Sequence, residues 1–161
     1  MTYLIEGLSP DRFAPLFALD DAALAAINAR RVTATADRGF PCRVSLDDAR
    51  TGENLILIHH TSHDVETPYR SAYAIYVRHG VAATTWRDET PPVFAGRPLG
   101  LRAFAADGML RTARLAGPDE ADSAIRDLFA DDGISYIDAH NAAHGCFVAR
   151  IERDEAQGSE T

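Results

Sequence analysis

The segment LRAFAADGMLRTARL, residues 101–115, carries two apolar-rich stretches on either side of the dipeptide Asp107-Gly108. Tight β-hairpin turns favour Asp-Gly, because a two-residue turn of this kind needs positive φ. We therefore predict two antiparallel strands, Leu101–Ala105 and Met109–Leu115, joined by this turn. The remaining elements are assigned outward from the hairpin.

Residues 118–131, after the hairpin, have the pattern of an amphipathic helix. Gly117-Pro118-Asp119-Glu120 is typical of a helix start, and Gly133 of a helix end. One apolar stripe contains Ala121, Ala124, Ile125, Leu128 and Phe129. Two further strands are predicted beyond the helix, at 134–140 and 146–152, with a turn at 141–145 between them.

Short helices and strands are predicted before the hairpin. Ser9-Pro10-Asp11 indicates the start of one short helix, and Asp20-Asp21 the start of a second that runs to about Asn28. Leu24 and Ile27 should lie on the inner side of this second helix. Residues 35–54 are interpreted mainly as loop with a short strand at 43–46, and residues 55–60 and 73–78 as strands.

These elements define an α+β fold with a largely antiparallel sheet. The N-terminal part supplies short helices, and the one longer helix lies near 118–131. The chain has 161 residues, of which 46% are hydrophobic and 25% charged, as expected for one ordinary domain. We predict a single domain over residues 1–153 and a disordered tail over residues 154–161.

Composition excludes several classes of function. All 16 basic residues are arginine, so no side-chain amine is present for a Schiff base or a phosphate loop. A net charge of −8 argues against a nucleic-acid partner. The longest aliphatic run, Leu55–Ile58, is far too short to cross a membrane, and residues 1–7 lack a signal-peptide pattern. We expect a cytoplasmic protein with no membrane partner.

Two cysteines, Cys42 and Cys146, are candidate nucleophiles. The predicted turn at 141–145 would bring His140 close to Cys146. A thiolate–imidazolium pair can then form, with His140 transferring protons. Cys42 is next to Arg43, whose charge would favour a thiolate. The alternative is that each cysteine is a small buried apolar residue.

Two arginines follow prolines that stiffen the chain. They lie in Pro41-Cys42-Arg43 and in Pro68-Tyr69-Arg70. Such arginines suit a carboxylate or phosphate, and Tyr69 and Asn141 are candidate ligand-binding neighbours. The alternative is that Arg43 and Arg70 pair with acidic residues of the same domain.

A metal site is a second hypothesis for the C-terminal turn. Imidazole and thiolate groups suit zinc or a similar divalent metal, and the candidate ligands are His140, His144, Cys146 and His63. Their spacing matches no zinc signature, and hydrogen-bonded histidines are the alternative. If this hypothesis is wrong, we expect no cofactor.

Several segments together resemble a family of small bacterial proteins, domain of unknown function twelve-oh-three. They are Gly39–Arg43, Pro68–Ser71, Ile75–Arg78, Leu101–Phe104, His140-Asn141 and Gly145–Phe147. The resemblance implies a compact bacterial domain and brings no activity with it. The positions it marks are Cys42, Arg43, Tyr69, Arg70, His140, Asn141 and Cys146.

Three functions follow as hypotheses. The first is a protein that binds a small anionic molecule, with or without Cys/His-dependent catalysis, through segments 39–45, 67–71 and 138–146. The second is the metal site described above. The third is a non-catalytic protein-interaction module that uses a sheet edge or an apolar face. A homo-oligomer is compatible with all three.

Overall fold

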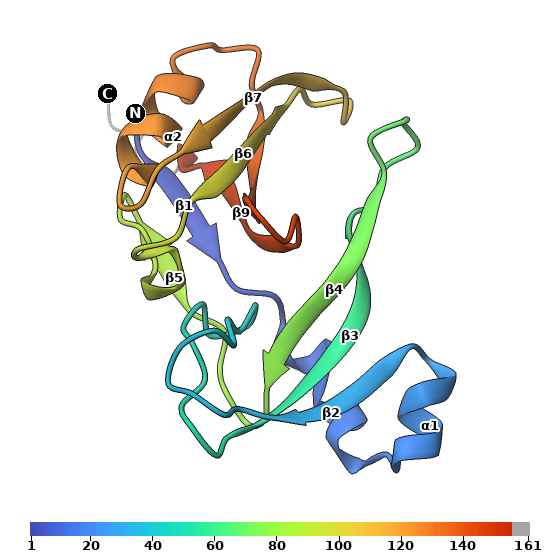
Figure 1. Ribbon diagram of the computed structural model, residues 1–161. Coiled ribbons are helices and arrows are strands. Elements are labelled where there is room, and N and C mark those ends of the chain that lie inside the picture. The colour runs from blue at the N-terminus through green and yellow to red at the C-terminus, as the bar shows by residue number, and fades with distance from the viewer. Residues whose placement is uncertain (156–161) are drawn as a thin grey trace.

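The strands of the protein form two antiparallel sheets (Figure 1) in a computed structural model that describes residues 1–155. The six-stranded sheet has the order β5-β1-β9-β8-β6-β7, and the three-stranded sheet has the order β2-β3-β4. The larger sheet contains β1 (Tyr3–Glu6), β5 (Thr85–Arg87), β6 (Leu99–Phe104), β7 (Leu110–Ala116), β8 (Tyr136–Asn141) and β9 (Phe147–Arg153). The smaller sheet contains β2 (Ala29–Thr33), β3 (Asn54–His63) and β4 (Ser71–Arg78).

The helices are few and short. They are α1 (Asp21–Ala26), α2 (Ala121–Phe129) and three 3₁₀ turns, Pro10–Arg12, Ala14–Ala18 and Pro92–Phe94. None of the helices within residues 1–155 has the length and apolar character needed to cross a membrane. The predicted single-domain α+β fold with a largely antiparallel sheet is confirmed.

The β6–β7 hairpin forms where the sequence predicts it, with a longer turn. The Gly108 N–H donates to the Ala105 carbonyl at 3.0 Å, and the Ala105 N–H donates to the Met109 carbonyl at 2.9 Å. Gly108 has a φ of +83°, whereas Asp107 is not in the positive-φ region. This is the geometry of a type I turn closed by a left-handed glycine, so the expected two-residue turn is wrong.

Helix α2 covers the larger sheet and completes its core. The predicted apolar stripe, from Ala121 to Phe129, is buried, and it packs in one cluster with strand residues such as Leu101 and Ile151. The smaller sheet has a separate core in which Ile56, Ile75 and Val77 pack against Phe13 and Leu24 from the N-terminal helices. Each sheet therefore buries its own apolar face.

Some details predicted for the N-terminal half are wrong. The short helix predicted from Ser9 does start there, but it consists of two 3₁₀ turns. Helix α1 ends at Ala26 because Asn28 has a φ of +55° and begins the turn into β2. Ile27 is 43% exposed instead of buried. Segment 43–46 forms a turn instead of a strand, closed by the Leu46 N–H on the Cys42 carbonyl.

Asp154, the first residue of the predicted tail, is hydrogen-bonded to the first strand region of the chain. The Asp154 N–H donates to the Thr2 carbonyl at 3.0 Å, and the Thr2 hydroxyl donates to the Asp154 carbonyl. Asp154 therefore extends the β1–β9 pairing. Residues 156–161 of the predicted tail lie outside the described residues.

Replacement of Leu101 by alanine should lower the free energy of unfolding by about 2–5 kcal/mol, because it leaves a cavity in the larger core. Leu101 is fully buried, whereas Leu115, in the neighbouring strand, is 71% exposed. Urea unfolding of Leu101→Ala and of the control Leu115→Ala measures the difference. Equal losses in the two variants would contradict this description of the core.

Candidate functional site

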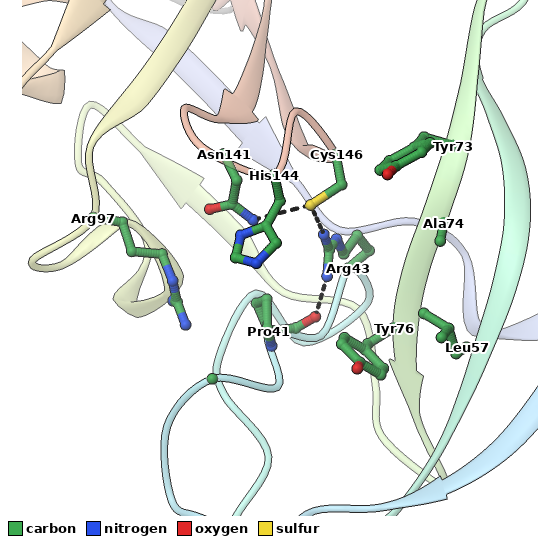
Figure 2. A pocket seen from close by; sticks show the side chains of 11 residues that line it. Pro41, Arg43, Leu57, Tyr73, Ala74, Tyr76, Arg97, Asn141, His144 and Cys146 are labelled. Atoms are coloured by element: carbon green, nitrogen blue, oxygen red, sulfur yellow. Dashed lines mark hydrogen bonds between the residues drawn. The ribbon is translucent and has the colours of Figure 1, made fainter.

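A pocket of about 350 Å³ lies where the two sheets meet (Figure 2). One wall comes from β3 and β4, the opposite wall from the turn between β8 and β9, and the floor from the loop around residue 41. The lining residues are Gly39, Pro41, Arg43, Leu57, Tyr73, Ala74, Tyr76, Arg97, Asn141, His144 and Cys146. The pocket therefore joins segments that are about a hundred positions apart in sequence.

The guanidinium of Arg43 lies at the base of this pocket and is 1% exposed. Its Nε donates to the Phe147 carbonyl at 2.8 Å, its Nη1 donates to the Pro41 carbonyl, and its Nη2 donates to the Cys146 sulfur at 3.2 Å. Within residues 1–155 no carboxylate forms an ion pair with it. The predicted pairing of Arg43 with an acidic residue is therefore not found in this part of the chain.

Burial and the two cysteine sulfurs act in opposite directions on Arg43. Burial lowers the pKa of the guanidinium, whereas Cys146, and Cys42 more weakly, raise it. An arginine keeps its charge in proteins, so this site holds a buried cation. A buried cation needs compensation, which here comes from two carbonyl dipoles and a sulfur atom.

The Cys146 sulfur accepts two N–H groups at the wall of the pocket. They come from Arg43 Nη2 and Asn141 Nδ2, each at 3.2 Å, and Figure 2 shows both directed at the sulfur. Cys146 is 9% exposed. The sulfur therefore faces the pocket with two N–H donors already in place, one from a guanidinium and one from an amide.

The turn between β8 and β9 fixes the position of Cys146. The Gly145 N–H donates to the Asn141 carbonyl at 2.8 Å, and the Asn141 N–H donates to the Cys146 carbonyl at 2.9 Å. His140 adds a third tie, because its Nδ1 lies 2.9 Å from the Gly145 carbonyl. A carbonyl only accepts, so Nδ1 carries the proton. Gly145, with a φ of +78°, allows the tight reversal.

The two predicted histidines of this turn lie differently. His140 is buried, its pKa is lowered by that burial, and it does not line the pocket. His144 is exposed and lines the pocket, and Figure 2 shows its ring directed into it. His144 is therefore the imidazole with access to a molecule held beside Cys146.

Cys42 lies on the other side of Arg43 and is fully buried. Its sulfur accepts the backbone N–H groups of Val44, Ser45 and Arg78 at 3.3–3.4 Å. These bonds tie the loop to β4. Cys42 does not line the pocket, so among the two candidate cysteines only Cys146 faces it.

The bend at 67–71 does not join the pocket. Arg70 pairs with Asp64 at 2.9 Å, and both side chains are exposed. Tyr69 packs edge-on against Phe104, and its carbonyl accepts from His63 Nδ1. The structure therefore brings segments 39–45 and 138–146 together at the pocket and leaves segment 67–71 apart from them.

Arg97, Tyr73 and Tyr76 line the pocket and were not predicted. Arg97 is held by Asp48 through two bonds, at 2.6 and 3.0 Å. Tyr73 and Tyr76 come from β4 and are three positions apart, so strand alternation puts them on opposite faces and does not indicate that both line one pocket. Arg97 carries no sequence signal.

The four candidate metal ligands do not converge. Both ring nitrogens of His63 are occupied, Nδ1 by the Tyr69 carbonyl at 2.9 Å and Nε2 by the Tyr136 hydroxyl at 2.7 Å. Among residues 1–155 no group of three or more histidine, cysteine, aspartate or glutamate side chains is placed to hold a metal ion.

The fold and site define a small α+β protein with a cysteine–arginine pocket between two sheets. The chain belongs to the family described as "Protein of unknown function (DUF1203)", which matches residues 39–153. The resemblance inferred from the sequence is confirmed, and the matched span contains every pocket-lining residue. No curated protein and no solved structure matches the chain.

His60, between the two sheets, should make stability depend on pH. Burial is the main cause that lowers its pKa from 6.5 to about 4. The unfolded chain then binds more protons than the folded chain between these values, so the free energy of unfolding should fall as the pH drops from 6.5 to 4. The contribution of His60 to the slope of the unfolding free energy against pH approaches about 1.4 kcal/mol per pH unit.

Urea unfolding at several pH values measures this slope. His60→Gln should flatten it, whereas His59→Gln, at the exposed neighbouring position, should leave it unchanged. An unchanged slope in His60→Gln would show that other groups cause the acid sensitivity.

Proposed function

We propose that the pocket binds a small anionic molecule and presents Cys146 to it as a nucleophilic thiolate. One observation carries this proposal: the buried guanidinium of Arg43 donates to the Cys146 sulfur and has no carboxylate partner within residues 1–155. A cation in such a position favours an anion beside it. The sulfur is the anion that the chain itself supplies.

The charges around the pocket support an anionic ligand. The lining includes Arg43, Arg97 and His144, and among the described residues that line it none is acidic. The chain as a whole has 24 acidic and 16 basic residues, so this local composition is opposite to the average. Asp48 compensates Arg97, whereas Arg43 has no carboxylate partner within residues 1–155, so the Cys146 thiolate and the bound anion share its charge.

Each polar residue then has a role. Arg43 and Asn141 hold the sulfur. The Cys146 thiolate adds to a carbonyl carbon of the bound molecule: the C–S bond forms as the C=O π pair moves to the oxygen, which takes a proton from the His144 side chain. His144 is exposed at the same pocket, and an imidazole is the side chain suited to exchange protons near neutral pH. His140 positions the turn through Gly145 instead of transferring protons. A reduced Cys146 fits a cytoplasmic location.

Alkylation with two reagents that differ in charge tests the proposal. Iodoacetamide should modify Cys146 at pH 6, where only about 0.3% of an ordinary thiol with a pKa of about 8.5 is ionised. Iodoacetate should gain from the local positive charge. The measured quantity is the rate with iodoacetate divided by the rate with iodoacetamide. We expect this ratio to be about fivefold higher in the folded than in the urea-unfolded chain, because two charges 4 Å apart in water interact by about 1 kcal/mol.

Mass spectrometry of the two cysteine peptides supplies an internal control. Cys42 is fully buried and should stay unmodified in the folded protein. Asn141→Ala removes one donor to the sulfur and should slow the reaction of Cys146 at pH 6 several-fold. If Cys146 reacts no faster than it does in the unfolded chain, and iodoacetate has no advantage, the proposal is wrong.

A further inference from the structure

The wall of the pocket opposite Cys146 is the outer edge of β4. β4 is the last strand of the three-stranded sheet, so one side of it pairs with β3 and the other side faces away. In an antiparallel pair the N–H and C=O of one residue point to the same side, and successive residues alternate. Which residues of β4 point outward can therefore be determined from their neighbours.

Two hydrogen bonds identify the outward residues. The Arg43 N–H donates to the Tyr76 carbonyl at 3.1 Å from the side away from β3. The backbone N–H and C=O of Tyr76 therefore point outward, and so do those of Ala74, two positions earlier. The His59 N–H, opposite Ala74 in the register, donates to Asn28 on the β2 side at 3.2 Å. Both bonds agree that the Ala74 N–H and C=O face away from the sheet.

Ala74 lines the pocket, whereas the loop that covers the edge stops short of it. The loop pairs with β4 at a parallel bridge between Cys42 and Tyr76. Within residues 1–155 no strand or bridge pairs with the outer side of Ala74. Figure 2 shows Ala74 between Tyr73 and Tyr76, across the pocket from Cys146 and Asn141.

We infer that the pocket's ligand is an amide-bearing carboxylic acid of about dipeptide size, bound in an extended conformation. The inference rests on the proposed function. The amide of the ligand pairs with the Ala74 N–H and C=O as an added strand would, and the carboxylate lies toward the guanidinium side of the pocket. A pocket of about 350 Å³ is large enough for such a molecule and too small for a long peptide.

The small side chains of this edge leave room for the ligand backbone. Ala72 and Ala74 project on the same face as Tyr76, and neither carries atoms beyond Cβ that would cover the strand. Tyr76 then bounds the site at the end where Arg43 lies. The ligand therefore continues the pairing that the loop makes at Tyr76.

Protection of Cys146 from iodoacetamide tests the inference with two acids of similar length and equal charge. N-acetylglycine carries an amide, and pentanoate does not. We expect N-acetylglycine to protect Cys146 half-maximally at about tenfold lower concentration than pentanoate, because only its amide can form hydrogen bonds with the Ala74 N–H and C=O. Ala74→Pro removes the outward N–H, and proline is tolerated in an edge strand where that N–H faces away from the sheet.

Ala72→Pro is the matched control, because Ala72 points outward on the same edge but does not line the pocket. Ala74→Pro should lose most of the preference for N-acetylglycine, and Ala72→Pro should keep it. If pentanoate protects as well as N-acetylglycine, or if the two variants behave alike, the inference is wrong and the anion pocket stands. If neither acid protects, the proposed function fails as well.

Discussion

The buried guanidinium of Arg43 is the contact on which the pocket between the two sheets depends. Its side chain donates to Cys146 and to Phe147, the first residue of β9 in the larger sheet, and its backbone N–H donates to Tyr76 in the smaller sheet. Its carbonyl accepts the N–H of Leu8. Because each sheet has its own apolar core, hydrophobic burial alone does not fix how they meet. Directional bonds contribute as well: those of Arg43, the bond between His63 Nε2 and the Tyr136 hydroxyl, and the bond from Arg150 to the Ser62 carbonyl.

The same contact explains why the proposed nucleophile lies at the junction. A buried charge without a carboxylate partner is stable only where its N–H groups meet fixed acceptors. Two of these acceptors are backbone carbonyls, and the third is the Cys146 sulfur. The β8–β9 turn must therefore hold that sulfur firmly, which the bond from His140 to Gly145 achieves. Buried His140 thus stabilises the site through the turn and not through the pocket.

Sequence reasoning succeeded where the information is local. The β6–β7 hairpin and the stripe of α2 depend on neighbours within a few residues. Strands β1 and β5 were missed because they are short, and their pairing depends on partners far away in the chain. For the site, local chemistry indicated Arg43, Asn141 and Cys146. It also suggested Arg70, which lies outside the pocket. A proline before an arginine does not show which end of the following strand, and so which part of the surface, the arginine occupies.

The two cysteines show why residue type does not determine reactivity. Both sulfurs accept several N–H groups and both lie near Arg43. The Cys42 sulfur receives only backbone donors inside a closed core, where the bonds stabilise a loop. The Cys146 sulfur receives N–H groups from a guanidinium and an amide at the wall of a pocket, where a ligand can reach it. Access to the pocket, which the junction of the sheets creates, is therefore what distinguishes the proposed nucleophile from a cysteine that only stabilises a loop.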